Sequence, residues 1–443
     1  MTLTDLIPSL RTSIPARLDH ALWPQSATLR HGDVALGRIP LADLVDTYGT
    51  PTYVVDEEDV RSRCRAYRHA FSGGEVAYAS KAFLSRAVAE WVNQEALSLD
   101  VSSIGELAVA CCVNFPADRI LLHGNAKTPE FLRSAIDYGV GRIVIDCMSE
   151  IPRIAALAET RQRVLIRVTP NVDADTHVAL ATGIADQQFG LPIESAHDAI
   201  RRVLGQPGLE LVGLHCHLGS QITQIEPYEI AARRLLDLIA DVRREHGVTL
   251  HELNLGGGHG IPYVTGDQEL DVTALAKRLR AVVKDECRTK SIVEPRITVE
   301  PGRSIVGRSA VALYRVIAIK HGTRTFVAVD GGMSDNPRPA LYGAQYTMRL
   351  VGRVSHAAPA LMTVVGQHCE AGDILARDIP LPDDLRPGDV LAMPCAGAYQ
   401  AAMASNYNLA QRPAVVAVHG GMSRVLLRRE TAADLLARDM SPR

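Results

Sequence analysis

Eight short apolar runs, separated by segments with helical spacing, constrain the fold of this chain more than any other feature. The runs lie between Glu75 and Arg303, and a longer segment that is apolar on one face follows each of them closely. Alternating strand and helix patterns predict βα units and a parallel sheet, and eight strands favour a closed (β/α)8 TIM-type barrel over an open sheet. The predicted strands are Val76–Ala79, Ser98–Val101, Arg119–His123, Arg142–Asp146, Val164–Val168, Leu211–His215, Glu252–Leu255 and Arg296–Val299.

The pattern changes after Ile305, where strand-like runs follow one another with no strong helix between most of them. A chain of 443 residues is also too long for one ordinary domain. We therefore predict an α/β fold with three parts: an N-terminal segment (1–48) that joins the β domain, the barrel (49–305), and a C-terminal all-β domain (306–443). The expected strands of the β domain are Ala310–Lys320, Thr325–Val329, Leu361–Val365, Val390–Pro394 and Ala414–Val418, with Ala35–Leu41 as an addition.

Charge and cysteine content narrow the partners. The 47 basic and 50 acidic side chains nearly balance, so nothing favours nucleic acid or an acidic membrane, and a small-molecule partner fits better. The eight cysteines contain no C-x-x-C pair, which argues against a zinc site and against a secreted disulfide framework. Residues 1–22 lack the apolar core of a signal peptide, so we expect a cytoplasmic protein without a membrane segment.

Chemistry in a βα barrel lies at the carboxyl ends of its strands, and this rim is predicted to hold an amine and a glycine loop. Lys81 follows the first strand, and lysine forms Schiff bases with carbonyl compounds. Taken alone, Lys81 is better explained as a surface residue. Gly256, Gly257 and Gly258 follow the seventh strand, where backbone N–H groups can approach a phosphate, although a glycine run is often only a turn.

Two further rim residues have both a functional and a structural interpretation. Glu300 follows the eighth strand and would pair with a protonated ring nitrogen of a cofactor, or else form a salt bridge to Arg303. His217 follows the sixth strand and would stack on such a ring, or else be a hydrogen-bonded core residue.

The β domain adds a polar cluster after one of its predicted strands. Cys369 is suited to returning a proton to a carbanion and Glu370 to binding an ammonium group, although a buried inert cysteine is the commoner case. Arg338 lies in a second polar stretch as a possible fork for a carboxylate.

Six motifs in fixed order carry a resemblance that extends from Tyr48 to Pro413. They are Tyr78-Ala-Ser-Lys81, His215-Cys-His-Leu-Gly-Ser-Gln-Ile222, Gly256-Gly-Gly258, Glu300-Pro-Gly-Arg303, Cys369-Glu370-x-Gly-Asp373 and Gly397-Ala-Tyr399. Together they resemble the alanine racemase-like, fold-type III decarboxylases that depend on pyridoxal 5'-phosphate (PLP), and among these the diaminopimelate decarboxylase family. The resemblance implies PLP-dependent decarboxylation of meso-2,6-diaminopimelate to L-lysine and CO2, the last step of lysine biosynthesis.

The resemblance also implies roles for individual residues. Lys81 would carry PLP as a Schiff base, and Cys369 would protonate the product carbanion. The active site would lie at the interface of a homodimer, with Cys369 and Glu370 supplied by the partner chain. The remaining implied cofactor residues are Asp100, His217, Ser220, Gly256, Gly257, Gly258, Glu300, Gly302 and Tyr399, and the substrate residues are Arg303, Arg338, Tyr342, Glu370 and Tyr399.

Three positions depart from the family pattern: Ala371 replaces a serine, Gln188 replaces a lysine, and His259 replaces an apolar residue after the glycine run. They leave open a paralogous fold-type III decarboxylase for another diamino acid or a carrier-bound amino acid. An alanine racemase would need arginine in place of Glu300. A non-catalytic PLP-binding relative would lack the β-domain cluster, and a Schiff-base aldolase without PLP would leave that cluster without a task.

Overall fold

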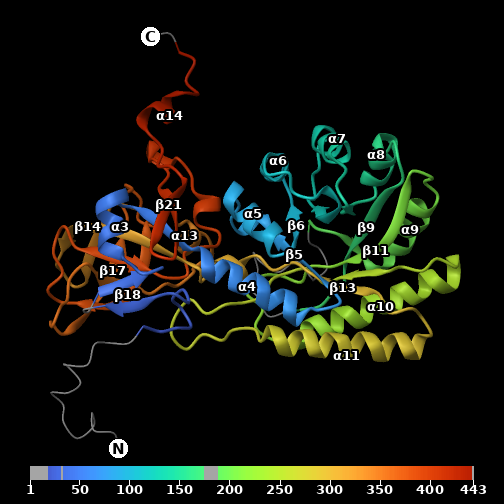
Figure 1. Ribbon diagram of the computed structural model, residues 1–443, viewed down its shortest axis with the longest axis horizontal. Coiled ribbons are helices and arrows are strands. Elements are labelled where there is room, and N and C mark those ends of the chain that lie inside the picture. The colour runs from blue at the N-terminus through green and yellow to red at the C-terminus, as the bar shows by residue number, and fades with distance from the viewer. Residues whose placement is uncertain (1–17, 31–32, 174–187, 442–443) are drawn as a thin grey trace, which may run out of the picture. The chain divides into compact units, whose positions relative to one another are not determined.

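The computed structural model describes residues 18–30, 33–173 and 188–441, and the chain divides into two compact units (Figure 1). The barrel unit comprises Arg61–Ile261 and Gln268–Ile305, and the sheet unit comprises Met1–Val60, Pro262–Asp267 and Val306–Arg443.

The barrel unit contains a closed ring of parallel strands. In the described residues eight strands pair in sequence order, and the ring closes because the last strand pairs with the first, with Val299 beside Val76. Each predicted strand is present to within two residues at either end, so the predicted TIM-type barrel is confirmed. The strands are β5 (Glu75–Ala79), β6 (Ser98–Val101), β7 (Ile120–Leu122), β8 (Arg142–Ile145), β9 (Gln162–Thr169), β11 (Leu209–His215), β12 (Glu252–Asn254) and β13 (Arg296–Val299), with the two-residue β10 (Leu191–Pro192) beside β9.

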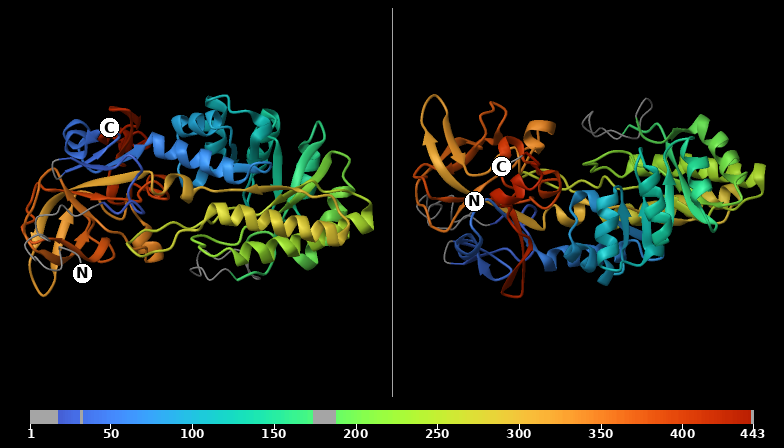
Figure 2. Two further views of the ribbon diagram at one scale, coloured as in Figure 1. Left: turned by 60° about the horizontal axis from the view of Figure 1, so that its bottom comes forward. Right: turned by 90° about the horizontal axis from the view of Figure 1, so that it is seen from above.

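Helices follow the strands, and four of them begin at residues whose side chains cap them. The hydroxyls of Ser85, Ser103 and Thr128 and the carboxylate of Asp271 each accept a hydrogen bond from a backbone N–H in the first turn of a helix. The two longest helices, α10 and α11, run side by side (Figures 1 and 2). The helices are α4 (Glu57–Ala70), α5 (Arg86–Gln94), α6 (Ile104–Cys112), α7 (Pro129–Tyr138), α8 (Glu150–Leu157), α9 (Ile193–Leu204), α10 (Glu226–His246), α11 (Val272–Lys290) and α12 (Arg303–Val306).

The sheet unit is built on a nine-stranded sheet, as predicted for an all-β region. Seven of its described strands follow the order β18-β17-β15-β14-β4-β20-β21, and β19 pairs with β14 and β16. The strands are β4 (Thr52–Asp56), β14 (Ala310–Lys320), β15 (Thr325–Val329), β16 (Arg349–Val351), β17 (Pro359–Val365), β18 (Ile374–Pro382), β19 (Val390–Met393), β20 (Ala414–His419) and β21 (Met422–Leu427). The α-helices of its described residues are α3 (Leu41–Tyr48), α13 (Arg338–Tyr342) and α14 (Ala432–Leu436).

The expected additional strand over Ala35–Leu41 takes a different form. Its residues contribute to β2 (Asp33–Leu36) and β3 (Ile39–Pro40), which pair with β1 (Thr28–Arg30) in a separate three-stranded sheet. The strand that completes the nine-stranded sheet is instead β4, between β14 and β20. Strand pairing over such sequence distances depends on tertiary contacts rather than on local pattern.

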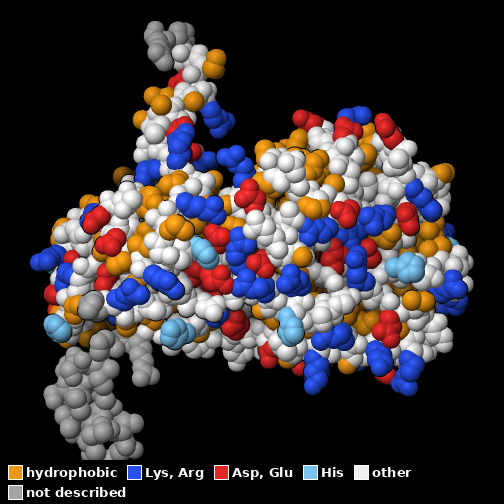
Figure 3. Space-filling model, in the orientation of Figure 1, with side chains coloured by type: hydrophobic (Ala, Val, Ile, Leu, Met, Phe, Trp, Pro, Cys, Tyr) orange, Lys and Arg blue, Asp and Glu red, His pale blue; other side chains and the backbone are white. Residues whose placement is uncertain are grey.

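The surface seen in Figure 3 shows basic and acidic side chains interspersed, in keeping with the nearly balanced composition. Among the described helices, none combines the length and the apolar content needed to cross a bilayer.

Candidate functional site

Lys81 lies at the carboxyl end of β5, in a short 3-10 helix formed by Ser80–Ala82. Its side chain is exposed, whereas its neighbours Ser80 and Ala82 are buried. The backbone N–H of Ala79 donates to the carbonyl of Pro301, 3.1 Å away, so the end of β5 is held against the chain that follows β13. A Cβ on Gly302 would lie 3.0 Å from the carbonyl oxygen of Ala79, which makes glycine the fitting residue at this close approach. The amine and the Glu300 motif therefore share one part of the rim.

Glu300 lies at the centre of a buried polar cluster at this end of the barrel. His123 Nε2 lies 2.9 Å from Oε1, His215 Nε2 lies 3.1 Å from Oε2, and the amide of Asn254 donates to Oε1 over 2.7 Å. Asp100 flanks the cluster, with its Oδ1 3.8 Å from His123 Nε2. The alternative role of Glu300 as the salt-bridge partner of Arg303 is not needed to explain its burial, because the two imidazoles and the amide already satisfy it.

Electrostatics keep Glu300 ionised. Burial opposes its charge, but the neighbouring His123 and His215 hold the pKa of Glu300 well below its usual value. Burial also opposes charge on His123, yet Asp100 and Glu300 together raise the pKa of His123. Burial raises the pKa of Asp100 to about 6, an effect that nearby Glu300 reinforces. The cluster thus places one firmly ionised carboxylate beside an imidazole that favours its charged form.

The two histidines of β11 behave differently from His123. Burial lowers the pKa of His215 to about 4, so it bonds Glu300 as a neutral N–H donor. Burial, with the positive charges of Lys81 and Arg167, lowers the pKa of His217 well below its usual value. His217 Nδ1 accepts a hydrogen bond from the backbone N–H of Gly257 at 3.1 Å, which assigns its proton to Nε2. At neutral pH His217 therefore offers an uncharged ring.

The glycine loop passes between close backbone neighbours. Gly256 and Gly258 have φ angles of 68° and 88°, in the left-handed region that favours glycine. A Cβ on Gly257 would lie 2.1 Å from the carbonyl oxygen of Glu300. On the same rim the guanidinium of Arg303 donates to Ser220 Oγ over 2.9 Å. The loop and Ser220 supply backbone amides and a hydroxyl, the donors that a phosphate requires.

His259, which departs from the family pattern, is a buried core residue directly after the glycine loop. Its Nδ1 lies 2.9 Å from the hydroxyl of Tyr67, and the two rings stack at 5.6 Å. Burial lowers its pKa to about 3, so His259 remains neutral at neutral pH. Of the other two departures, both Gln188 and Ala371 are exposed.

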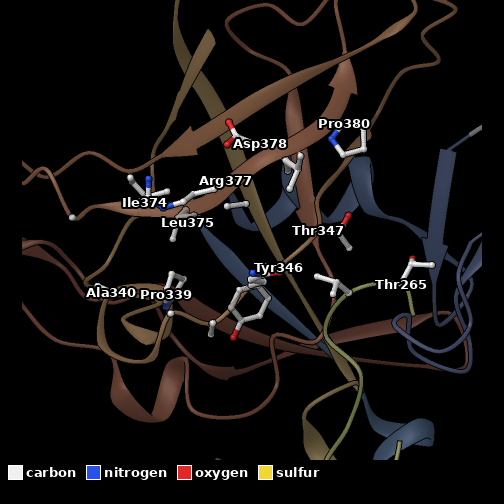
Figure 4. A pocket seen from close by; sticks show the side chains of 17 residues that line it. Thr265, Pro339, Ala340, Tyr346, Thr347, Ile374, Leu375, Arg377, Asp378 and Pro380 are labelled. Carbon is white, nitrogen blue, oxygen red and sulfur yellow. The ribbon is translucent and has the colours of Figure 1, made fainter. Parts of the chain in front are cut away.

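In the sheet unit, Arg338 and Tyr342 lie at opposite ends of α13. Arg338 is buried, bonds the hydroxyl of Tyr346 and lies 4.5 Å from the centre of the Tyr263 ring. Tyr346 also forms part of the wall of a hollow of about 750 Å³ (Figure 4). Its other walls come from α13 and the residues after it, from β18, and from Val264 and Thr265, and they include Pro339, Thr347 and Pro380. Arg338 is therefore a buried cation whose hydrogen-bond partner faces an open cavity.

Cys369 and Glu370 lie in the connection between β17 and β18, and both are exposed. The alternative of a buried, inert cysteine is therefore wrong for Cys369. The hydroxyl of Tyr407 donates to the Glu370 carboxylate over 3.3 Å. Tyr399 is partly exposed and has a positive φ of 57°.

Sequence reasoning missed three members of the Glu300 cluster: His123, His215 and Asn254. It gave His123 and Asn254 no role, and it used His215 only as part of a motif. The signal was available, since all three stand in or directly after predicted strands. What it lacked was the knowledge that β7, β11 and β12 direct these side chains toward one carboxylate.

The donor set of the rim fits PLP. An ionised, buried carboxylate matches a protonated ring nitrogen, Lys81 offers an amine for a carbonyl, His217 is a neutral ring, and the glycine loop with Ser220 suits a phosphate. The imidazoles and carboxylate of His123, His215 and Glu300 also have ligand atoms within 4.8 Å of one another, but both imidazole N–H groups are engaged with Glu300. The cluster therefore favours an organic cation over a metal ion.

Comparison with known proteins agrees with this geometry. The family model for the pyridoxal-binding domain of pyridoxal-dependent decarboxylases matches residues 57–307. A diaminopimelate decarboxylase of Actinosynnema pretiosum subsp. auranticum is 52% identical over 443 residues, which cover 99% of this chain and 100% of the relative. The diaminopimelate decarboxylase of Mycobacterium tuberculosis is 47% identical over 433 residues, 94% of this chain and 97% of the relative.

Two solved structures extend the comparison to the fold. A diaminopimelate decarboxylase of M. jannaschii in complex with L-lysine is 33% identical, with a TM-score of 0.89 over 95% of this chain and 99% of that one. The Helicobacter pylori enzyme with L-lysine is 29% identical, with a TM-score of 0.84 over 90% of this chain and 98% of that one. The predicted fold class, enzyme class and PLP cofactor are confirmed. This chain belongs to the diaminopimelate decarboxylase family of pyridoxal-dependent decarboxylases.

Proposed function

We propose that this protein removes the α-carboxylate of meso-2,6-diaminopimelate as CO2 and releases L-lysine, with Lys81 holding PLP. The observation that carries the proposal is the buried, ionised Glu300, which His123, His215 and Asn254 fix at the barrel rim. When bound, PLP supplies a cationic ring that accepts the electron pair left behind by the departing CO2. A carboxylate that stays ionised in a buried site keeps a proton on the ring nitrogen, and this makes the ring a strong electron acceptor.

The other rim residues bind and orient. Lys81 would hold the cofactor through its amine and yield that position to the substrate amine. His217, as a neutral ring, would pack on the cofactor face without opposing its charge. Gly256–Gly258, Ser220 and Tyr399 would bind the phosphate, as the resemblance implies, and Asp100 and Gly302 would complete the set of cofactor residues.

Four residues of the sheet unit, together with Arg303 of the barrel rim, would select the substrate and complete the reaction. Arg303, Arg338 and Tyr342 would bind the distal carboxylate, and Glu370 the distal ammonium group. The Cys369 thiol would donate its proton to the α-carbon after CO2 has left, and the thiolate would regain a proton from solvent. A substrate without the second carboxylate would leave buried cations unpaired, so ornithine should react poorly.

A substrate panel tests the reaction. We expect CO2 from meso-diaminopimelate, and little from LL- or DD-diaminopimelate, ornithine or arginine. Release from ornithine but not from meso-diaminopimelate would contradict the proposal. It would instead favour the paralogous decarboxylase that Ala371 left open.

Reduction of the holoenzyme with borohydride tests the role of Lys81. The yellow protein should lose its visible band, and peptide mapping should find the label on Lys81. A Lys81→Ala variant should stay unlabelled. Label on another lysine would contradict the assignment.

We also propose a homodimer in which Cys369 and Glu370 act in the site of the partner chain. The exposure of both side chains on the sheet unit supports this arrangement. Lys81→Ala and Cys369→Ala should each be nearly inactive, but a mixture that exchanges subunits should regain about a quarter of wild-type activity, because half of the random dimers carry one intact site. A mixture that stays inactive after exchange would show that each chain builds its site alone.

Finally, we propose a cytoplasmic location. All eight cysteines are free thiols in the structure, the usual state in a reducing compartment. Fractionation of the source cells, followed with an antibody to the chain, tests this placement.

A further inference from the structure

Cys369 and Glu370 stand at the tip of one of three segments of the sheet unit that hydrogen bonds join into a single support, which we call the brace. The segments are 332–335 after β15, 366–373 between β17 and β18, and 405–410 before β20. Each pair of segments is joined by hydrogen bonds between described residues. The two exposed side chains, which have proposed chemical roles, therefore stand on backbone that hydrogen bonds hold in place.

Asp373 joins the first two segments. Its buried carboxylate accepts hydrogen bonds from the backbone N–H groups of Met333 at 2.6 Å and His368 at 2.8 Å. A Cβ on Gly332 would come within 2.8 Å of this carboxylate, and a Cβ on Gly366 within 2.3 Å. Both glycines leave the space that the Asp373 side chain requires.

His368, which directly precedes Cys369, joins all three segments. Its Nε2 lies 2.8 Å from Ser334 Oγ in the first segment, and its Nδ1 lies 3.1 Å from Asn408 Oδ1 in the third. Both ring nitrogens are thus engaged, and the side chain is buried. The backbone position of Cys369 is set by an imidazole held at both ends.

The third segment reaches the tip itself. Tyr407 donates its hydroxyl to Glu370 over 3.3 Å, and its ring centre lies 5.3 Å from that of His368. The backbone N–H of Ser405 donates to the carbonyl of Ser334, which closes the set of three connections. Asn408 and Leu409 have φ angles of 53° and 56°, a conformation rare for two successive residues other than glycine. Such backbone persists only where the surroundings require it, and it is concentrated at functional sites.

We infer that Tyr407 and His368 are positioning residues: Tyr407 orients the Glu370 carboxylate toward the distal ammonium group of the substrate, and His368, held by Ser334 and Asn408, fixes Cys369 for proton donation. The inference rests on the proposed function. It adds two residues that act through Glu370 and Cys369 rather than on the substrate itself.

The two residues should affect different kinetic constants. Glu370 contacts a part of the substrate that does not react, so a misplaced Glu370 weakens ground state and transition state alike and raises KM. Cys369 acts on the reacting carbon, so a displaced thiol lowers kcat. A merely structural role for the brace would lower the melting temperature (Tm) without separating KM from kcat.

The first test compares two tyrosine hydroxyls of the sheet unit. Tyr407→Phe should raise KM for meso-diaminopimelate about fivefold, as expected for one weak hydrogen bond to a carboxylate, with kcat within about twofold of wild type. Tyr48→Phe is the matched control, because it removes a hydroxyl that bonds Ser423 Oγ at 2.9 Å, outside the three segments. Its KM and kcat should equal those of wild type. The visible cofactor band should be unchanged in both variants.

The second test removes the support of His368. Asn408→Gly keeps a backbone that tolerates positive φ but deletes the amide oxygen, and it should lower kcat about tenfold with little change in KM. Asn408→Asp retains an oxygen acceptor and should recover most of the lost kcat.

The outcomes separate the inference from the function on which it rests. A wild-type enzyme that releases no CO2 from meso-diaminopimelate overturns the proposed function. An active wild type with an unchanged KM in Tyr407→Phe overturns the role of Tyr407. An unchanged kcat in Asn408→Gly, or a loss that Asn408→Asp does not restore, overturns the role of His368. Asn408→Gly tests folding as well, and Tyr407→Phe stays informative if that variant is unstable.

Discussion

The two ends of the barrel use charged side chains in opposite ways. At the amino ends of the strands, Arg142 pairs with Glu75 at 2.6 Å and with Glu252 at 3.0 Å, and Arg296 lies 2.8 Å from both carboxylates. Two fixed cations balance two anions there. At the carboxyl ends, Glu300 is held by two imidazoles and an amide.

This difference follows from the pKa values of the side chains involved. Although burial opposes its charge, Arg142 lowers the pKa of Glu75 below its usual value, so both partners are charged at neutral pH. An imidazole gains or loses a proton near neutral pH, so the groups around the imidazoles of the Glu300 cluster can adjust their charge. The end of the barrel at the amino ends of the strands is thus suited to stability, and the end at their carboxyl ends is suited to chemistry, as expected for a TIM barrel.

The largest effect should come from breaking the ion-pair network at the amino ends of the strands. This network joins Glu75, Arg142, Glu252 and Arg296, and we call it the lower network. Arg142→Met would leave two buried carboxylates with only Arg296, and breaking such a pair costs about 3–5 kcal/mol. We expect Tm to fall by about 10 °C while kcat per folded enzyme stays within twofold. Arg288→Met, at an exposed helix position that pairs with the exposed Asp285, is the control and should leave Tm nearly unchanged. A large loss of kcat in Arg142→Met would show that the two ends are coupled.

The same chemical change at each end sharpens the contrast. Glu300→Gln removes the charge that would hold the ring nitrogen protonated and should lower kcat about 100-fold, with the cofactor band retained. Glu252→Gln, at the amino ends of the strands, should lower Tm and leave kcat unchanged. Parallel measurements of kcat and Tm check both variants, and a kcat loss of similar size in Glu252→Gln would refute the division of roles.

Much of the barrel could be predicted because its pattern is local. Ser98–Val101 and Arg296–Val299 appear as strands with the predicted bounds, and the closed ring then places Lys81 and Glu300 on one rim. The partners of Glu300 were harder to predict, as His123 shows. His123 approaches it from another strand of the ring, and this depends on side-chain directions within the closed barrel rather than on spacing.

The lower network shows what the same reasoning left unused. Glu75, Glu252 and Arg296 each begin a strand in the structure, as Arg142 does. The residues at the strand starts could therefore have been used to predict the network, just as the residues at the strand ends were used to predict the site. In the sheet unit, β4 and the small sheet of β1 to β3 were harder to predict. Their pairing joins residues far apart in sequence, and no local pattern selects among the available partners.

A smaller effect should appear in the pH dependence of stability. The pKa of His123 is raised in the folded protein, so its contribution to stability is complete below its unfolded value of about 6.5 and is lost as pH rises through the folded value. His123→Gln keeps an N–H donor but cannot titrate. The Tm difference between wild type and variant should therefore be largest near pH 6 and shrink toward alkaline pH. A constant difference across this range would mean that His123 is neutral in the folded protein.

The smallest effect concerns the exposed edge of the lower network. The Arg296 side chain is 42% exposed, and its Nη2 alone lies 2.8 Å from both Glu75 and Glu252, so a lysine ammonium could keep much of this pairing. Because solvent screens exposed ion pairs, Arg296→Lys should cost less than about 1 kcal/mol, a Tm loss of about 2 °C. The loss should be larger in low salt than in 0.5 M NaCl, where screening already weakens the wild-type pairs. A loss as large as that of Arg142→Met, or one independent of salt, would mean that Arg296 belongs to the buried part of the network and that the lower end depends on both arginines equally.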